Sequence, residues 1–263
     1  MRYEMMFRRR TAARKTGVAE AGWLRLETLE PRLLLSADLQ PAGTAVIEQV
    51  INSVQAPVAS ESLQLLIEGP GSVQLLEDDG RLLLRIDGST EQTHIRTDPA
   101  AAARQINGIE ATSALGSLEL ANLTLDGTAH FAAGIQLIRL GDLHDSHVQL
   151  DGSGATRLEA GTVRDTQVHA ANVALALSAK QWTSSHTGTS RIDAASLSSL
   201  TITGDLATDL YLSGQGAPAY TLGTVSIGGQ LGDGLWAIHG RASTINVCAG
   251  HGALLHRCKS YGQ

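Results

Sequence analysis

The sequence predicts an all-β fold: a parallel β-solenoid with a small α/β capping region on its N-terminal side. A repeat of about 20 residues, with apolar and polar residues alternating inside each repeat, is the main observation. Composition agrees, because aromatic residues make up 3% of the chain against 43% hydrophobic residues overall, which suits a narrow aliphatic interior. Crossovers between parallel strands are almost always right-handed, so we expect a right-handed solenoid.

Seven short apolar runs between residues 115 and 247 mark the repeat. Their starts lie 20, 20, 19, 23, 25 and 20 positions apart, at Leu118, Ile138, Leu158, Leu177, Leu200, Val225 and Ile245. In most repeats a glycine turn follows and then one apolar residue, which is Leu143, Val163, Trp182, Leu206 or Leu231. Glycine allows either a positive φ or a close backbone approach in such turns. Stacking the rungs about 4.8 Å apart would bury the aliphatic side chains as internal columns.

The segments on either side of the repeat are less regular. Residues 42–56 have helical spacing and predict an amphipathic helix that caps the solenoid and ends before Pro57. Residues 62–96 predict strands, with a hairpin whose arms are 73–76 and 82–86. Residues 98–107 predict a helix, with Asp98 as N-cap and Gly108 after its end. Two loops, 183–190 and 213–222, lengthen their repeats outward.

The pattern breaks at Cys248, and residues 251–263 are predicted to be irregular. Two accounts compete, a divergent end or a chain shortened by truncation or frameshift, and we favour truncation. The two cysteines, Cys248 and Cys258, could pair but do not define a disulfide scaffold. Such low cysteine content suits the cytosol and large bacterial surface proteins equally.

Charge and hydropathy exclude several classes of function. The chain carries a net charge of −6, and residues 1–15 hold six Lys or Arg against Glu4, so the rest is acidic at −11. An acidic body argues against a nucleic-acid partner. The sequence has no apolar run of about 18 residues and thus predicts no transmembrane helix. The basic start has no apolar segment of about 7–15 residues after it, so an ordinary secretory signal is not predicted.

A short motif near the N-terminus resembles a known family. Residues 29–35 match the LEPR-XLL signature of long, repetitive bacterial proteins regarded as surface-located, at all of its specified positions: Leu29, Glu30, Pro31, Arg32, Leu34 and Leu35. The resemblance implies a surface or secreted location and no catalytic activity, and it assigns no role to any one residue. Members of that family are usually much longer than this chain. The alternative is a plain helix start with Pro31 in its first turn.

Aspartates recur at one place in the repeat and are candidates for a metal site. Asp145 and Asp165 each lie two residues after the single apolar residue of their repeat, and Asp233 repeats this placement. An acidic column could bind calcium. The preferred interpretation is that they are turn residues bonded to local backbone, because other repeats carry Ser184 and Thr208 there.

Histidines and aromatic residues offer weaker candidates. His144 and His147 are three apart, which puts them on opposite faces of a strand, and with His169 they are interpreted as solvated side chains. Trp182, Tyr211 and Trp236 could stack on sugars, although Trp182 occupies a core position. We therefore predict no catalytic, cofactor-binding or metal-binding residues, and no cofactor.

These observations divide the chain into four parts: a basic segment with the motif (1–41), the capping region (42–112), the solenoid (113–250) and the tail (251–263). The predicted function is non-enzymatic, a structural or adhesin-like segment of a bacterial cell-surface or secreted repetitive protein. A carbohydrate-active β-helix enzyme, of the polysaccharide lyase or hydrolase type, and a non-functional truncated remnant are the alternatives. Candidate partners are a surface polysaccharide or a host or cell-surface ligand. An extracellular or surface location is expected, and a cytoplasmic one stays open.

Overall fold

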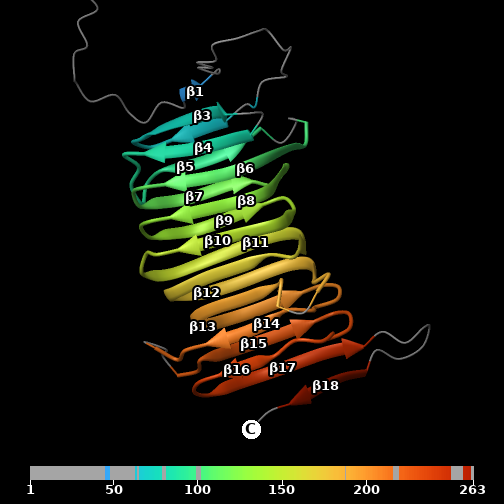
Figure 1. The fold of residues 1–263 in the computed structure, drawn as a ribbon. Helices are drawn as coiled ribbons and strands as arrows, with labels where there is room; N and C mark the ends of the chain where they lie inside the picture. Colours follow the sequence, from blue (N-terminus) through green and yellow to red (C-terminus); the bar gives the residue numbers. More distant parts are fainter. Residues whose placement is uncertain are drawn as a thin grey trace, which may run out of the picture. The chain divides into compact units, whose positions relative to one another are not determined.

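The computed structural model describes residues 45–47, 63, 65–78, 81–98, 102–186, 188–215, 219–249 and 257–261, which all belong to one compact unit, Pro41–Gln263. Over these residues the fold is all-β, and parallel strands stack into a solenoid of about seven turns, as predicted (Figure 1). The first strands in chain order are β1 (Ala45–Ile47), β2 (Leu65–Glu68), β3 (Ser72–Asp78), β4 (Arg81–Asp87), β5 (His94–Thr97), β6 (Arg104–Ala111), β7 (Leu115–Leu120), β8 (Leu123–Phe131) and β9 (Ile135–Leu140).

The remaining strands complete the stack toward the C-terminal side. They are β10 (Leu143–Leu150), β11 (Gly154–Arg164), β12 (Gln167–Thr183), β13 (Arg191–Ile202), β14 (Asp209–Leu212), β15 (Leu222–Ile227), β16 (Trp236–Ile238), β17 (Ala242–Ala249) and β18 (Arg257–Tyr261). The expected loops are confirmed as breaks between β12 and β13 and between β14 and β15. The longest strands, β11, β12 and β13, form the middle of the stack.

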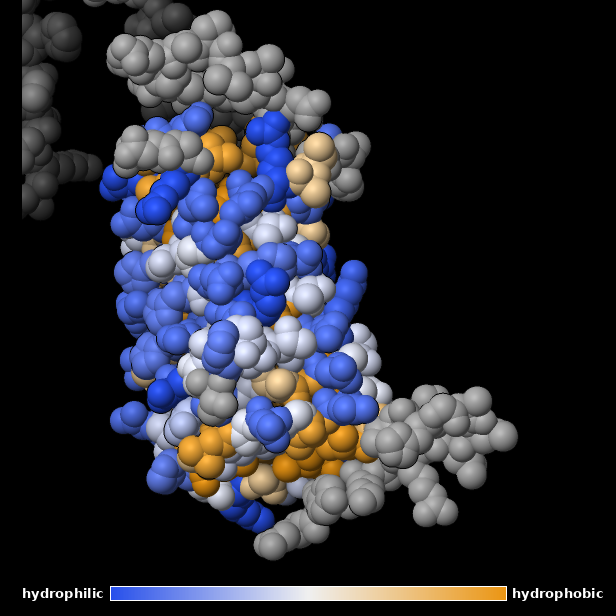
Figure 2. Space-filling view, turned by 45° about the vertical axis from the view of Figure 1, so that its right-hand side comes forward, coloured by the Kyte–Doolittle hydropathy of each residue, from blue (hydrophilic) through white to orange (hydrophobic). Residues whose placement is uncertain are grey.

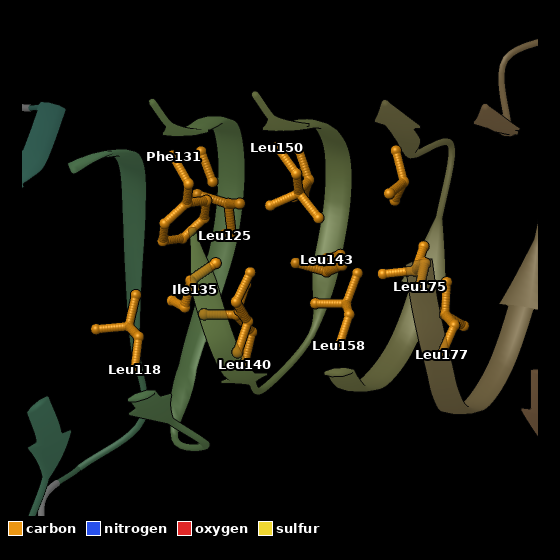
Figure 3. Close-up of a cluster of buried hydrophobic side chains, with 14 of the residues drawn as sticks. Leu118, Leu125, Phe131, Ile135, Leu140, Leu143, Leu150, Leu158, Leu175 and Leu177 are labelled. Atoms are coloured by element: carbon orange, nitrogen blue, oxygen red, sulfur yellow. The ribbon is translucent and has the colours of Figure 1, made fainter. Parts of the chain in front are cut away.

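The apolar starts predicted from the repeat form one continuous column, which we call column A. Each is paired in parallel register with the next, and the members are Leu118, Ile138, Leu158, Leu177, Leu200, Val225 and Ile245. All but Ile245 are at most 2% exposed. The side chains point into an apolar interior between the strands, as Figure 3 shows for several rungs. The repeat period therefore predicted the true register.

Two further columns lie in the interior beside column A. Column C is the single apolar residue after each turn, and its register is confirmed through Leu143, Val163, Trp182, Leu206 and Leu231. Column B consists of Ile109, Ala129, Val148, Val168, Ile192, Leu210 and Trp236. The chain visits A, C and B once per turn, so each rung buries three short apolar segments against its neighbours. Aliphatic burial of this kind stabilises by about 1.5–3 kcal/mol per large side chain.

The turn glycines are required by close backbone approach. None of Gly141, Gly161 and Gly204 has a positive φ. The Gly161 amide donates to the Gly141 carbonyl at 2.5 Å, and the Gly204 amide donates to the Lys180 carbonyl at 2.7 Å. A Cβ on Gly141 would lie 2.5 Å from the Leu123 carbonyl oxygen, closer than real Cβ contacts. The turns thus stack directly on one another, and glycine is the residue that permits it.

The predicted hairpin is confirmed, and the parallel stack begins earlier than expected. Strands β3 and β4 pair antiparallel from Ser72↔Asp87 to Asp78↔Arg81. Strand β4 then pairs in parallel with β6, and β5 pairs in parallel with β7, so rungs begin before residue 113. Strands β3 and β2 cap these first rungs by antiparallel pairing with β4 and β5. A hairpin can precede a parallel ladder because both use the same strand spacing.

Both predicted helices are wrong wherever the structure describes them. Of residues 42–56, the described part is β1, which pairs antiparallel with β2. Residues 104–107 lie in β6, where Arg104 pairs with Leu123 and Ile106 with Leu125. The helical signal was local, an N-cap followed by alanines. Pairing with β8 and burial of Ile106 in column C override that signal.

The tail is also more ordered than predicted. Residues 257–261 form β18, which pairs antiparallel with β17 from Ile245↔Tyr261 to Ala249↔Arg257. The described strand β16 pairs with β14 and takes no second strand among the described residues. Figure 2 shows polar side chains over the middle rungs of one face and apolar side chains gathered toward the C-terminal end. Leu231 and Leu235, at 44% and 61% exposed, belong to those last rungs.

Candidate functional site

Five outward side chains from five successive rungs form what we call the polar stripe: His130, Gln149, His169, Asp193 and Tyr211. They lie on β8, β10, β12, β13 and β14 and share one parallel register. Their neighbours along each strand, such as Ala129 and Phe131, are buried, so alternation forces the stripe outward. The stripe combines hydrogen-bond donors, acceptors and one aromatic ring at the spacing of the rungs.

The N-terminal half of the stripe is organised by Asp151, which directly follows β10. The His130 Nε2 lies 2.8 Å from Asp151 Oδ2, and the Gln149 side-chain amide donates to both carboxylate oxygens at 2.9 Å. The hydrogen bond from Gln149, followed by that from His130 and the nearby charges of His130 and His169, lowers the pKa of Asp151. The carboxylate therefore stays ionised into acidic solution.

The C-terminal half of the stripe is organised by Arg191. Its Nη2 donates to Asp193 Oδ1 at 2.8 Å, and the guanidinium carbon lies 4.0 Å from the centre of the Tyr211 ring. Hydrogen bonding to Asp193 raises the pKa of Arg191. His169 Nδ1 lies 4.0 Å from Asp193 Oδ2 and links the two halves. The Arg191 cation covers one face of Tyr211, so sugar stacking would have to use the other face.

A second outward column, on the strands that carry column A, pairs charges from rung to rung. Arg139 Nη1 lies 2.7 Å from Glu119 and its Nε lies 2.7 Å from Glu159. Arg96 continues this charge ladder in register with Glu119 and bonds Glu68 at 3.0 Å. Beyond Glu159 the column becomes uncharged, with Ser178, Thr201, Ser226 and Asn246. The opposite charges neutralise one another across neighbouring strands, as cross-strand pairs do.

The aspartates considered for a calcium-binding column have different surroundings. Asp145 and Asp165 both adopt the left-handed backbone region, with φ of 46° and 50°. Asp165 Oδ1 accepts from the Ser185 amide and the Thr189 hydroxyl, each at 2.7 Å. The Asp145 side chain is 63% exposed and lies 3.8 Å from Arg164. Within the described ranges no group of three or more His, Cys, Asp or Glu is placed to hold a metal ion.

Turn aspartates bind the backbone of the following rung. Asp142 accepts from the Thr162 amide at 2.7 Å, Asp205 from Gln230 at 2.8 Å and Asp209 from Leu235 at 2.8 Å. Asp165 makes the same kind of bond to Ser185. These carboxylates satisfy amides of the next turn, 20 to 26 residues along the chain. The bonds to backbone expected for Asp165 therefore exist, but they join rungs and are not local.

The other predicted candidates are placed as follows. Trp182 is 1% exposed in column C, and its indole N–H donates to the Ser190 hydroxyl at 2.6 Å. Trp236 ends column B and donates to the Thr208 carbonyl at 3.3 Å. His144 and His147 flank a register shift in β10, and His147 pairs with Gln167. Trp182 is thus a core residue and Trp236 is partly buried against the core. The prediction that His144 and His147 lie on opposite faces is wrong, because the register shift between them leaves both side chains partly exposed beside buried Leu143 and Val148.

Sequence reasoning missed the pairing of His130 with Asp151 and the stacking of Arg191 on Tyr211. The register of columns A and C would not have placed His130 beside Gln149, because it extrapolates to Leu150 or Val148 and the pairing depends on a register shift within β10. The rotation of the Arg191 side chain onto the ring carries no sequence signal.

No family model, curated protein or solved structure matches this chain. The motif residues Leu29, Glu30, Pro31, Arg32, Leu34 and Leu35 lie outside the described residues. In the part of the chain that the structure describes, no helix is long and apolar enough to cross a membrane.

Proposed function

We propose that this chain is a non-enzymatic structural segment of a bacterial cell-surface or secreted repetitive protein, which presents its outward faces and loops to a ligand. The rung-to-rung use of its charged groups carries the proposal. Turn aspartates bind the next rung, and Glu119, Arg139 and Glu159 pair with one another. Groups held this way contribute to stacking, and carboxylates engaged in such bonds are not positioned as free acids or bases. The resemblance of residues 29–35 to the LEPR-XLL signature supports the location.

The polar stripe is the face best suited to a surface polysaccharide. Its side chains offer donors and acceptors on five successive rungs, and an extended glycan presents hydroxyls along its length in the same way. The uncharged column that contains Ser178 and Thr201 lies on the same strands β12 and β13 but offers short side chains. Binding should therefore depend on the stripe and not on that column.

A binding assay with matched variants tests this assignment. The full chain is screened against immobilised bacterial and host-surface polysaccharides, and binding is remeasured for His169→Ala and for Ser178→Ala, both outward on β12. We expect at least a tenfold loss for His169→Ala, about 1.4 kcal/mol, and little change for Ser178→Ala. Equal losses, or no binding to any polysaccharide, would reject the stripe as the ligand face.

Fractionation of the native source tests the location. The intact mass and N-terminal sequence are determined separately for protein recovered from cells and from medium. A product in the medium or on the surface, larger than 27.6 kDa or cleaved near residues 29–35, is the expected result. A product of 27.6 kDa confined to the cell interior would contradict it.

The alternative of a carbohydrate-active enzyme is tested by turnover. Specific depolymerisation of a polysaccharide, lost on replacement of Asp145 or Asp165, would overturn the non-enzymatic assignment. Release of unsaturated ends would indicate a lyase, and release of reducing ends alone would indicate a hydrolase.

A further inference from the structure

The two cysteines of the chain lie opposite each other at the C-terminal end of the solenoid. Cys248 on β17 and Cys258 on β18 are direct partners in the antiparallel register. Cys248 is disulfide-bonded, and Cys258 is the one other cysteine in the sequence. Directly opposed residues of an antiparallel pair have Cα atoms about 4.5–5.5 Å apart, within the range a disulfide spans.

The strand that carries Cys258 covers an otherwise open edge. Strand β17 is the last parallel strand of column A, and its other edge pairs with β15. Among the described strands, β18 pairs with β17 alone. Ile245 and Val247 of β17 are half-buried and pack against the core, while their counterparts Val225 and Ile227 one rung earlier are fully buried. A strand that is held by one hairpin pairing alone is marginally stable and needs further interactions to stay in place.

We propose that a disulfide between Cys248 and Cys258 is a redox-sensitive latch that holds β18 on the terminal edge of the solenoid. When closed, it covalently joins two residues that lie ten positions apart in the sequence and removes most of the freedom that β18 gains on release. When open, β18 separates readily and exposes the backbone edge of β17. An exposed edge of this kind recruits other strands, so opening also promotes self-association.

The opening step is an ordinary thiol–disulfide exchange. A dithiol reductant supplies two electrons and two protons, the sulfur–sulfur bond of the protein breaks, and two cysteine thiols form while the reductant becomes a disulfide. An oxidising compartment keeps the latch closed and a reducing one opens it. The inference depends on the register of β17 and β18 and is independent of the proposed function.

Limited proteolysis of the full chain tests the latch. Arg257 and Lys259 lie in β18, whereas Arg139 and Arg157 lie in the middle rungs and are the internal reference. The protein is purified without reductant and divided into two samples. One sample is treated with dithiothreitol, and both are then digested with trypsin. We expect cleavage after Arg257 and Lys259 to become at least about tenfold faster on reduction, with cleavage after Arg139 and Arg157 unchanged.

A variant and a thiol titration keep the test decisive. The doubly substituted Cys248→Ser, Cys258→Ser protein should be cleaved in β18 at the fast rate with or without dithiothreitol. Titration of the wild-type protein should find no reactive thiol before reduction under denaturing conditions and two after it. Two thiols before reduction, or equal β18 cleavage in the oxidised and reduced proteins, would overturn the proposal without recourse to the variant.

Discussion

Asp145 and Asp165 show how one residue type at one repeat position serves different purposes. Both have a positive φ, which aspartate tolerates better than most residues. Asp165 is also a hydrogen-bond acceptor for the loop of the next rung, while Asp145 points to solvent. Buried hydroxyl groups also form hydrogen bonds at the corner between columns C and B. The Ser146 hydroxyl donates to the Leu125 carbonyl, and the Thr166 hydroxyl donates to the Arg164 carbonyl.

Replacement of each aspartate by alanine separates backbone strain from hydrogen bonding. Asp165→Ala loses two acceptor contacts and is expected to lower the free energy of unfolding by about 1–2 kcal/mol more than Asp145→Ala. Both variants carry the same strain of alanine at positive φ, so Asp145→Ala is the matched control. Denaturant unfolding of the two proteins measures the difference. Equal losses would mean that the Asp165 contacts contribute nothing.

Acidic pH should destabilise the solenoid through the same carboxylates. The Ser185 amide, then the Thr189 hydroxyl, lower the pKa of Asp165, and Gln149 and His130 lower that of Asp151. A carboxyl whose pKa is lower in the folded state binds protons more readily when unfolded. Its stabilisation is complete above the unfolded pKa, near 3.9, and is lost as pH falls through the folded pKa.

The measurement is the thermal midpoint from pH 6 to pH 2. We expect a plateau at the upper end and a fall that begins at about pH 4. Asp165→Ala should show a shallower fall than the wild-type protein. An identical slope in the two proteins would exclude Asp165 from the acid response.

At the scale of the single rung, the free energy that an apolar side chain contributes to folding depends on whether the next rung covers it. Leu206 and Leu231 occupy consecutive positions of column C and are bridged to each other. Leu206 has neighbours above and below and is 0% exposed, whereas Leu231 is 44% exposed at the last rung. The same side chain thus has full burial in one turn and half in the next.

Leu206→Ala should lower the free energy of unfolding by about 2–5 kcal/mol, since the cavity lies between two rungs. Leu231→Ala, in the same column and with the same chemistry, should cost less than about 1 kcal/mol. Equilibrium unfolding in urea measures both. Equal costs would show that column C is covered at its end by something beyond the described residues.

At the scale of the whole solenoid, each turn contacts its neighbours and stability is approximately a sum of such contacts. Strands β11, β12 and β13 are paired on both edges, while β16 is paired on one edge among the described strands. Local opening should therefore cost most in the middle of the stack and least at its ends.

Native-state hydrogen exchange measures this gradient. Amides of β11, β12 and β13 should be the most protected, and those of β16 and β18 the least, with β18 losing protection further on reduction of the disulfide. Uniform protection along the stack would instead indicate a single cooperative unit.

The sequence by itself determined the period, the strand type and the register of the core. Apolar positions recur because the pleat sends alternate side chains inward and each rung must match the one before it. Columns A and C were therefore readable from spacing alone, including Trp182, where the turn residue is Lys180. Aspartates and glycines marked the turns, although the contacts that require them join neighbouring rungs.

The tertiary structure alone decided the ends of the stack and the contacts of its outer faces. Residues 104–107 carry a local helix signal but lie in β6, because burial between rungs outweighs a propensity of a few tenths of a kcal/mol per residue. Pairing of Cys248 with Cys258 across β17 and β18 joins residues ten apart, which is no multiple of the repeat. His130 and Asp151 are 21 residues apart, about one repeat, but their side-chain contact has no signal in the repeat pattern. Such contacts depend on the direction of the side chains and on which strand edge is open to pairing. Neither is defined until the rungs have stacked.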